Sequence, residues 1–140
     1  MYTRTAMMVL GAAVLCAGCV ATTHKGDVDS PDLVLRVTDS NGTVTELAHA
    51  QILGQNTKGV VTLIDDLIEF DIPLSKVSRI SVRERTGSQD NHHITVTLKS
   101  GENRTGWMNM APVRFVGQTA MGQAQIRMFD VREVENVTRR

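Results

Sequence analysis

The sequence predicts an all-β protein, a small antiparallel sandwich or barrel that follows a flexible tether. Apolar and polar residues alternate with a period of two in several stretches, an Asn-Gly pair marks a hairpin turn, and no stretch after the N-terminal segment keeps a 3.6-residue period. The chain has 140 residues, which suits one compact domain, and only 4% of them are aromatic. The core must therefore be built largely from aliphatic side chains and methionine.

The first two predicted strands form a hairpin. Residues 33–38 alternate in hydropathy, and Asn41-Gly42 follows them. An Asn-Gly pair favours a type I′ turn, in which both central residues have a positive φ. Residues 43–47 are expected to form the returning strand, and residues 46–53 a short helix.

Four later stretches are also predicted to be strands. Residues 67–74 alternate between an apolar face that includes Phe70 and an acidic one, and residues 93–98 place Ile94 and Val96 on one side and threonines on the other. Such alternation is typical of antiparallel strands with one face on the core and one in water. The four stretches are residues 59–66, 67–74, 79–84 and 93–98.

Two parts of the chain are similar, which predicts an internal repeat. Residues 72–80 align with residues 126–134, and apolar residues match at four positions. Each segment suggests a strand, a tight corner that buries a valine, and a second strand. Residues 54–55 also match residues 117–118, and the polar run 85–93 is expected to join the halves. Two similar half-domains would pack as a sandwich or small barrel, an arrangement that removes free sheet edges.

The first 18 residues have the composition of a secretory signal. Arg4 precedes a run of ten uncharged residues, and Ala17 and Gly18 supply the small residues of a cleavage site. A membrane span needs about 20 apolar residues, which is longer than this run. Residues 1–18 are therefore predicted to be a signal peptide, residues 19–31 a flexible tether, and residues 32–140 a single β-rich domain.

The box Cys16-Ala17-Gly18-Cys19 resembles the lipobox of bacterial lipoprotein precursors, with cysteine where leucine is commonest. The resemblance implies that Cys19 carries a diacylglycerol and fatty acyl chains such as palmitate, so membrane lipid is the expected first partner. Several acyl chains anchor a protein firmly where one is marginal. Cys16 would leave with the signal, and the mature chain would have no free thiol. Val20 after the cysteine implies sorting to the outer membrane, facing the periplasm.

Charge argues against nucleic acid as a partner. Fifteen basic residues balance fifteen acidic ones, and no basic cluster occurs. A phosphate backbone needs a positive field that this chain does not provide.

One motif suggests a soft-metal site as an alternative function. Trp107-Met108-x-Met110 is similar to the Trp-Met-Met site of small periplasmic copper chaperones with β-barrel folds, although those space the residues as Trp-x-x-Met-x-Met. Thioethers suit Cu(I), so Met108, Met110 and His92 are the candidate ligands. In a strand, Trp107 would point away from both sulfur atoms. Alternatively, the two methionines fill gaps in a core that is poor in phenylalanine.

No catalytic constellation and no cofactor motif is recognisable. His92 and His93 would face opposite sides of a strand, and surface loop positions are expected for the histidines. Asp65-Asp66 suits an ordinary turn, although an envelope hydrolase that joins this pair to a histidine is a second alternative. The sequence therefore predicts a membrane-anchored envelope lipoprotein that acts as a non-catalytic binding or assembly module. Its partner would be an envelope protein, which strand edges could contact by sheet addition.

Overall fold

The structure, a computed structural model, describes residues 32–84 and 91–139, which form ten strands and two 3-10 turns. The predicted all-β class is confirmed. Within these ranges, no helix has the length and apolarity that a membrane crossing requires. The predicted signal peptide, the tether and Cys19 lie outside the described residues. The strands are β1 (Leu35–Asp39), β2 (Val44–Leu53), β3 (Val60–Asp65), β4 (Ile68–Pro73), β5 (Val77–Glu84), β6 (Asn91–Leu98), β7 (Asn103–Asn109), β8 (Arg114–Thr119), β9 (Gly122–Arg127) and β10 (Val131–Asn136), with turns η2 (Leu74–Lys76) and η3 (Met128–Asp130).

All ten strands belong to one antiparallel sheet with the order β4-β3-β7-β6-β5-β10-β1-β2-β8-β9. Exchanging β1–β5 for β6–β10 gives the same order read backwards. Each half of the chain therefore contributes the same series of elements: a hairpin, a second hairpin, a 3-10 turn and a final strand. This symmetry of the strand order supports the internal repeat that the sequence predicts.

Hydrogen bonds at the corners repeat as well. The Leu74 N–H donates to the carbonyl oxygen of Gly59, and the Met128 N–H donates to that of Val113, both over 2.9 Å. These corners coincide with the aligned segments 72–80 and 126–134. The match between residues 54–55 and 117–118 is wrong, because Gly117 lies within β8 whereas Gly54 follows β2.

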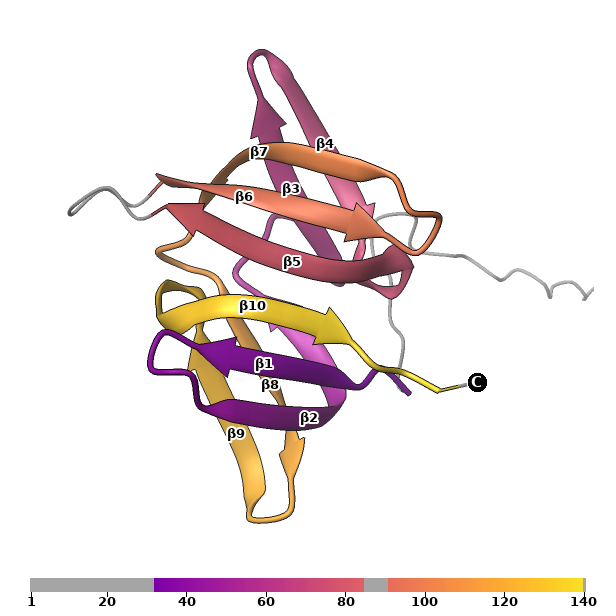
Figure 1. Ribbon diagram of the computed structural model, residues 1–140, viewed down its shortest axis with the longest axis vertical. Helices are drawn as coiled ribbons and strands as arrows, with labels where there is room; N and C mark the ends of the chain where they lie inside the picture. The colour runs from indigo at the N-terminus through magenta and orange to yellow at the C-terminus, as the bar shows by residue number, and fades with distance from the viewer. Residues whose placement is uncertain (1–31, 85–90, 140) are drawn as a thin grey trace, which may run out of the picture.

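The two halves exchange strands instead of folding separately. In Figure 1, β3 to β7 form an upper lobe, and β1, β2, β8, β9 and β10 form a lower one. We call them the continuous lobe and the divided lobe, because the second is built from two separate pieces of chain. The expectation of two half-domains is thus corrected: each lobe contains strands from both halves. The expectation that packing removes free edges is also wrong, since β4 and β9 end the sheet.

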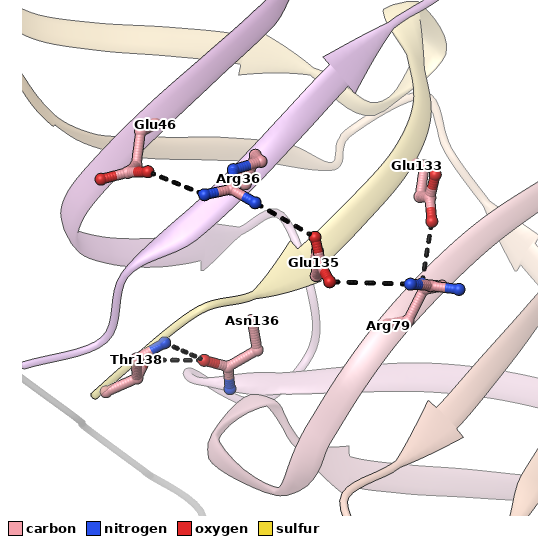
Figure 2. Close-up of polar contacts among 7 residues, drawn as sticks. All are labelled: Arg36, Glu46, Arg79, Glu133, Glu135, Asn136 and Thr138. Carbon is pink, nitrogen blue, oxygen red and sulfur yellow. Dashed lines mark hydrogen bonds and ion pairs between the residues drawn. The ribbon is translucent and has the colours of Figure 1, made fainter. Parts of the chain in front are cut away.

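The lobes meet where β5 pairs with β10, and a ladder of ion pairs crosses this junction (Figure 2). Arg36 of β1 contacts Glu46 of β2 and Glu135 of β10, each over 3.5 Å. Arg79 of β5 contacts Glu133 over 2.8 Å and Glu135 over 3.6 Å. Opposite charges on directly neighbouring strands stabilise their pairing.

Core side chains from both lobes form one apolar cluster. Its side chains are mainly aliphatic, as the composition predicts, with contributions from methionine and one large aromatic residue. Alternation explains the burial, because successive strand residues face opposite sides of a sheet. The largest fully buried side chains include Phe115, Leu35, Leu47, Ile52, Leu63, Ile80, Ile94, Met108, Met110 and Met128.

Two local predictions are corrected. Residues 46–53 are part of β2 and not a helix. The start of β2 pairs with β1, and the strand from Ala48 onward pairs with β8, with an irregularity between Ala48 and Gln51. The hairpin at Asn41-Gly42 is confirmed, but only Gly42 has a positive φ, of 87°. Its N–H donates to the carbonyl oxygen of Asp39 over 3.0 Å, the pattern of a type I turn followed by a left-handed glycine.

Candidate functional site

The repeat allows each surface position to be compared with its counterpart in the other half. The β3–β4 and β8–β9 hairpins have strands of equal length and turns of two residues, so their positions correspond one to one. Both hairpins extend from the body of the molecule, at opposite ends in Figure 1. Because the two hairpins have the same place in the fold, differences between their side chains are not required by the fold itself.

Four exposed apolar side chains lie at the end of the continuous lobe, but the strand register divides them between the two faces of the sheet. Ile64 of β3 lies directly opposite Trp107 of β7, and these side chains are 44% and 46% exposed. Leu67 in the β3–β4 turn is 95% exposed, and Ile68 at the start of β4 is 58% exposed. Ile68 is paired with Asp65 and lies on the face opposite to Ile64 and Trp107, so we call Ile64, Trp107 and the turn residue Leu67 the tip patch. The ring of His93 lies beside it, 5.0 Å from the Trp107 ring centroid.

The counterpart positions in the divided lobe are mostly polar or small. The counterpart of Ile64 is Gln118, and that of its partner Trp107 is Ala48, which is paired with Gln118. The counterpart of Ile68 is Gly122. Only Met121, the counterpart of Leu67, is also a large exposed apolar residue. The fold therefore tolerates polar and small residues at these positions. The neighbouring exposed side chains of Ile64 and Trp107 thus indicate an interaction site.

Acidic residues surround the tip patch. Asp65, Asp66 and Glu69 are exposed, and none of them forms an ion pair with another residue that the structure describes. Asp66 has a φ of 58° in the two-residue turn, so Asp65-Asp66 is the turn that the sequence suggests. The tip thus combines an apolar centre with a negative rim.

The candidate copper ligands lie in the core. His92 of β6 is directly opposite Met108 of β7, and Met110 follows on the same inward side. These three side chains are 2%, 2% and 0% exposed. The His92 ring packs edge-on against Phe129, with the centroids 5.7 Å apart. The structure therefore brings His92 and Met108 together, in positions that also suit the alternative role of filling the core.

Trp107 faces away from this core, as the alternation predicts, and so does His93. The expected surface loop position is wrong for His92, because His92 is the second residue of strand β6 and its side chain is buried. Among the described residues, no three His, Cys, Asp or Glu side chains are close enough to hold a metal ion. The acidic pair of the hydrolase alternative, Asp65 and Asp66, is exposed at a hairpin tip.

Sequence reasoning missed the tip patch. Residues 60–64 form an almost continuous apolar run, which resembles a fully buried strand. Two signals were available in the sequence. Ile64 directly follows the apolar Leu63 in a predicted strand, so the two side chains face opposite sides of the sheet, and the lone tryptophan, Trp107, stands at an outward position. Scans against models of protein families found no match. A search of curated proteins also found none.

Proposed function

We propose that the protein is a membrane-anchored envelope lipoprotein that acts as a non-catalytic binding module and docks an envelope protein through the tip patch. The observation that carries the proposal is the difference between equivalent positions at the ends of the two lobes. The continuous lobe exposes Ile64 of β3 beside Trp107 of β7, whereas the divided lobe has Gln118 of β8 beside Ala48 of β2 at the same positions. Aromatic anchors such as tryptophan dominate the energetics of protein interfaces.

The charge around the patch indicates what the partner surface carries. Asp65, Asp66 and Glu69 favour an apolar pocket with lysine or arginine at its rim, because such pairing steers encounter and fixes register. The same carboxylates disfavour insertion of the tip into an anionic lipid surface, which attracts basic segments. A protein is therefore the better candidate than the bilayer for contact with this tip, and the lipid on Cys19 would hold the module near it.

The proposal is tested by photocrosslinking in the native envelope. A photoreactive amino acid at position 64 is expected to yield one discrete crosslinked protein, and the same amino acid at position 118, the counterpart, is expected to yield none. Trp107→Ala, which introduces the residue found at the counterpart position, should abolish the adduct formed from position 64. Equal adducts from both positions, or an adduct that survives Trp107→Ala, would contradict docking through the tip patch.

The anchor is tested separately. Cells that express Cys19→Ala should fail to incorporate labelled palmitate into the protein, because the thiol that accepts the lipid is gone. Cys16→Ser is the matched control and should still be labelled. Continued labelling of the Cys19→Ala chain would show that the lipobox interpretation is wrong.

A further inference from the structure

A groove of about 620 Å³ runs along the edge strand β9 in the divided lobe. Val37 and Ile126 supply its apolar lining, and the β1–β2 turn supplies polar groups. Protein sites for small ligands and peptide side chains typically enclose roughly 300–1,000 Å³. The groove is thus large enough to receive several side chains.

The equivalent gap in the continuous lobe is crossed by a side chain of the protein itself. The Arg104 guanidinium carbon lies 4.6 Å from the centroid of the Phe70 ring, and Leu98 packs against the core. The divided lobe has smaller or shorter side chains at the counterpart positions: Thr45 for Arg104, Ala124 for Phe70 and Asp39 for Leu98. Of these, Thr45 and Asp39 line the groove. A long cation and an aromatic ring are therefore the groups that this space accepts in the other half of the same fold.

The two edge strands of the sheet, β4 and β9, differ in how well they are protected against pairing with another chain. The exposed residues of β4 include Glu69 and Asp71, and the strand ends at Pro73. Charged residues and proline protect an edge strand against pairing with another chain. The counterparts on β9 are Gln123, Gln125 and Arg127, so the β9 edge lacks the two carboxylates and the proline. Of the two edges, β9 is better suited to accept an added strand.

The groove carries a net negative charge. Its charged lining consists of Asp39, Asp130 and Arg127. Arg127 is paired with Asp130 over 3.2 Å, whereas one oxygen of Asp39 accepts the N–H groups of Asn41 and Thr43. The second oxygen of Asp39 stays available for a basic group.

We infer that this groove binds an extended peptide segment of a partner protein, which adds as a strand to β9 and places a basic and an apolar side chain in the groove. Backbone hydrogen bonds to the sheet edge would supply affinity, and alternate side chains would supply specificity. This site is distinct from the tip patch, because β9 and the β3–β4 hairpin lie at opposite ends of the sheet (Figure 1). Either surface could therefore fail its test without affecting the other.

The inference is tested with the full-length chain in detergent and a capped seven-residue peptide. The peptide has threonine at odd positions and arginine, phenylalanine and valine at even positions, so that the three larger side chains share one face. Amide NMR signals of Gln125, Ile126 and Arg127 are expected to shift with a saturable dependence on peptide concentration. A peptide with alanine for phenylalanine and glutamine for arginine should bind at least ten-fold more weakly.

The decisive variant is Thr45→Arg with Ala124→Phe, which gives the divided lobe the side chains that cross the gap in the continuous lobe. It should raise the Kd of the peptide at least ten-fold. Thr45→Arg alone serves if the double variant does not fold, and Ile64→Gln in the tip patch is the control that should bind normally. Unchanged binding to the blocked variant, shifts on β4 in place of β9, or no binding at millimolar peptide would overturn the inference. Shifts on β9 that depend on protein concentration alone would assign the groove to a second copy and also overturn it.

Discussion

Gly54 and Gly42 share a backbone conformation but differ in surroundings, with φ angles of 89° and 87°. A Cβ atom added at Gly54 would lie 1.9 Å from the carbonyl oxygen of Pro112, whereas a Cβ at Gly42 meets no atom within 4 Å. Gly54 follows β2, and Pro112 precedes β8, so the contact joins the two segments where the chain passes between the lobes. Only glycine permits this approach.

Alanine at these two glycines should therefore have different effects on stability. We expect Gly42→Ala to lower the free energy of unfolding by about 1–2 kcal/mol, the cost of a left-handed conformation for a residue with a side chain. Gly54→Ala should lower it by more than about 4 kcal/mol, because the backbone at Pro112 must move as well. Urea unfolding followed by circular dichroism measures both. Equal losses would contradict the proposed close approach.

Met108 and its neighbour His92 have two candidate roles, filling the core and binding a metal ion, and variants of Met108 test the first role. If Met108 only fills the core, Met108→Leu should cost less than about 1.5 kcal/mol, since the volume is nearly conserved. Met108→Ala should cost about 2–5 kcal/mol because it leaves a cavity. Thermal unfolding of the two variants measures these differences.

The copper alternative is tested on the same residues. Anaerobic titration with Cu(I) should leave the ring signals of His92 unchanged in NMR if the side chains are structural. A one-to-one shift of these signals that disappears in Met108→Leu would instead establish the soft-metal site. Trp107 fluorescence is a less direct probe, because its ring faces away from the sulfur atoms.

At the scale of elements, the ion-pair ladder supports the joint between β5 and β10 (Figure 2). Its side chains are 39–58% exposed, so solvent screens each pair and the contribution per pair is small. The three paired positions of β5 and β10 also bring Ile80 and Val134 together in the core. Buried apolar contact is thus the main contribution at this joint, and charge supplements it.

Arg79→Gln removes two contacts of the ladder and should lower the free energy of unfolding by no more than about 1 kcal/mol per pair. The difference from the wild type should shrink as salt is raised, because salt screens exposed charges. Arg132→Gln on β10 is the matched control, since Arg132 forms no ion pair with another described residue. A loss that is independent of salt would show that Arg79 acts through packing.

The whole molecule should unfold in one step in spite of its two lobes. Each lobe contains strands from both halves of the chain, and a single apolar cluster includes residues of both lobes. Separating the lobes would break the pairing of β5 with β10 and expose the shared core. The exchange of strands therefore links the stability of each lobe to that of the other.

We expect the urea midpoint from Trp107 fluorescence, which reports on the continuous lobe, to coincide with the midpoint from amide signals of β8 and β9 in the divided lobe. Ile80→Ala at the joint should lower both midpoints together, by about 2–5 kcal/mol in free energy. Two separate transitions in the wild type, or a variant that shifts only one midpoint, would show that the lobes unfold independently.

The sequence predicts the all-β class, most strands, the Asn-Gly hairpin and the repeated corners. Alternation is a local property that assigns each residue to one of two faces, so neighbouring residues suffice to reveal it. The strand order and the exchange of strands between the halves became visible only in the folded structure. Strand pairing joins segments far apart in the chain, and the same pattern suits many partners. The tip patch and the β9 groove emerge only when counterpart positions are compared in space. Both depend on which strand stands beside which, as Ile64 beside Trp107 illustrates.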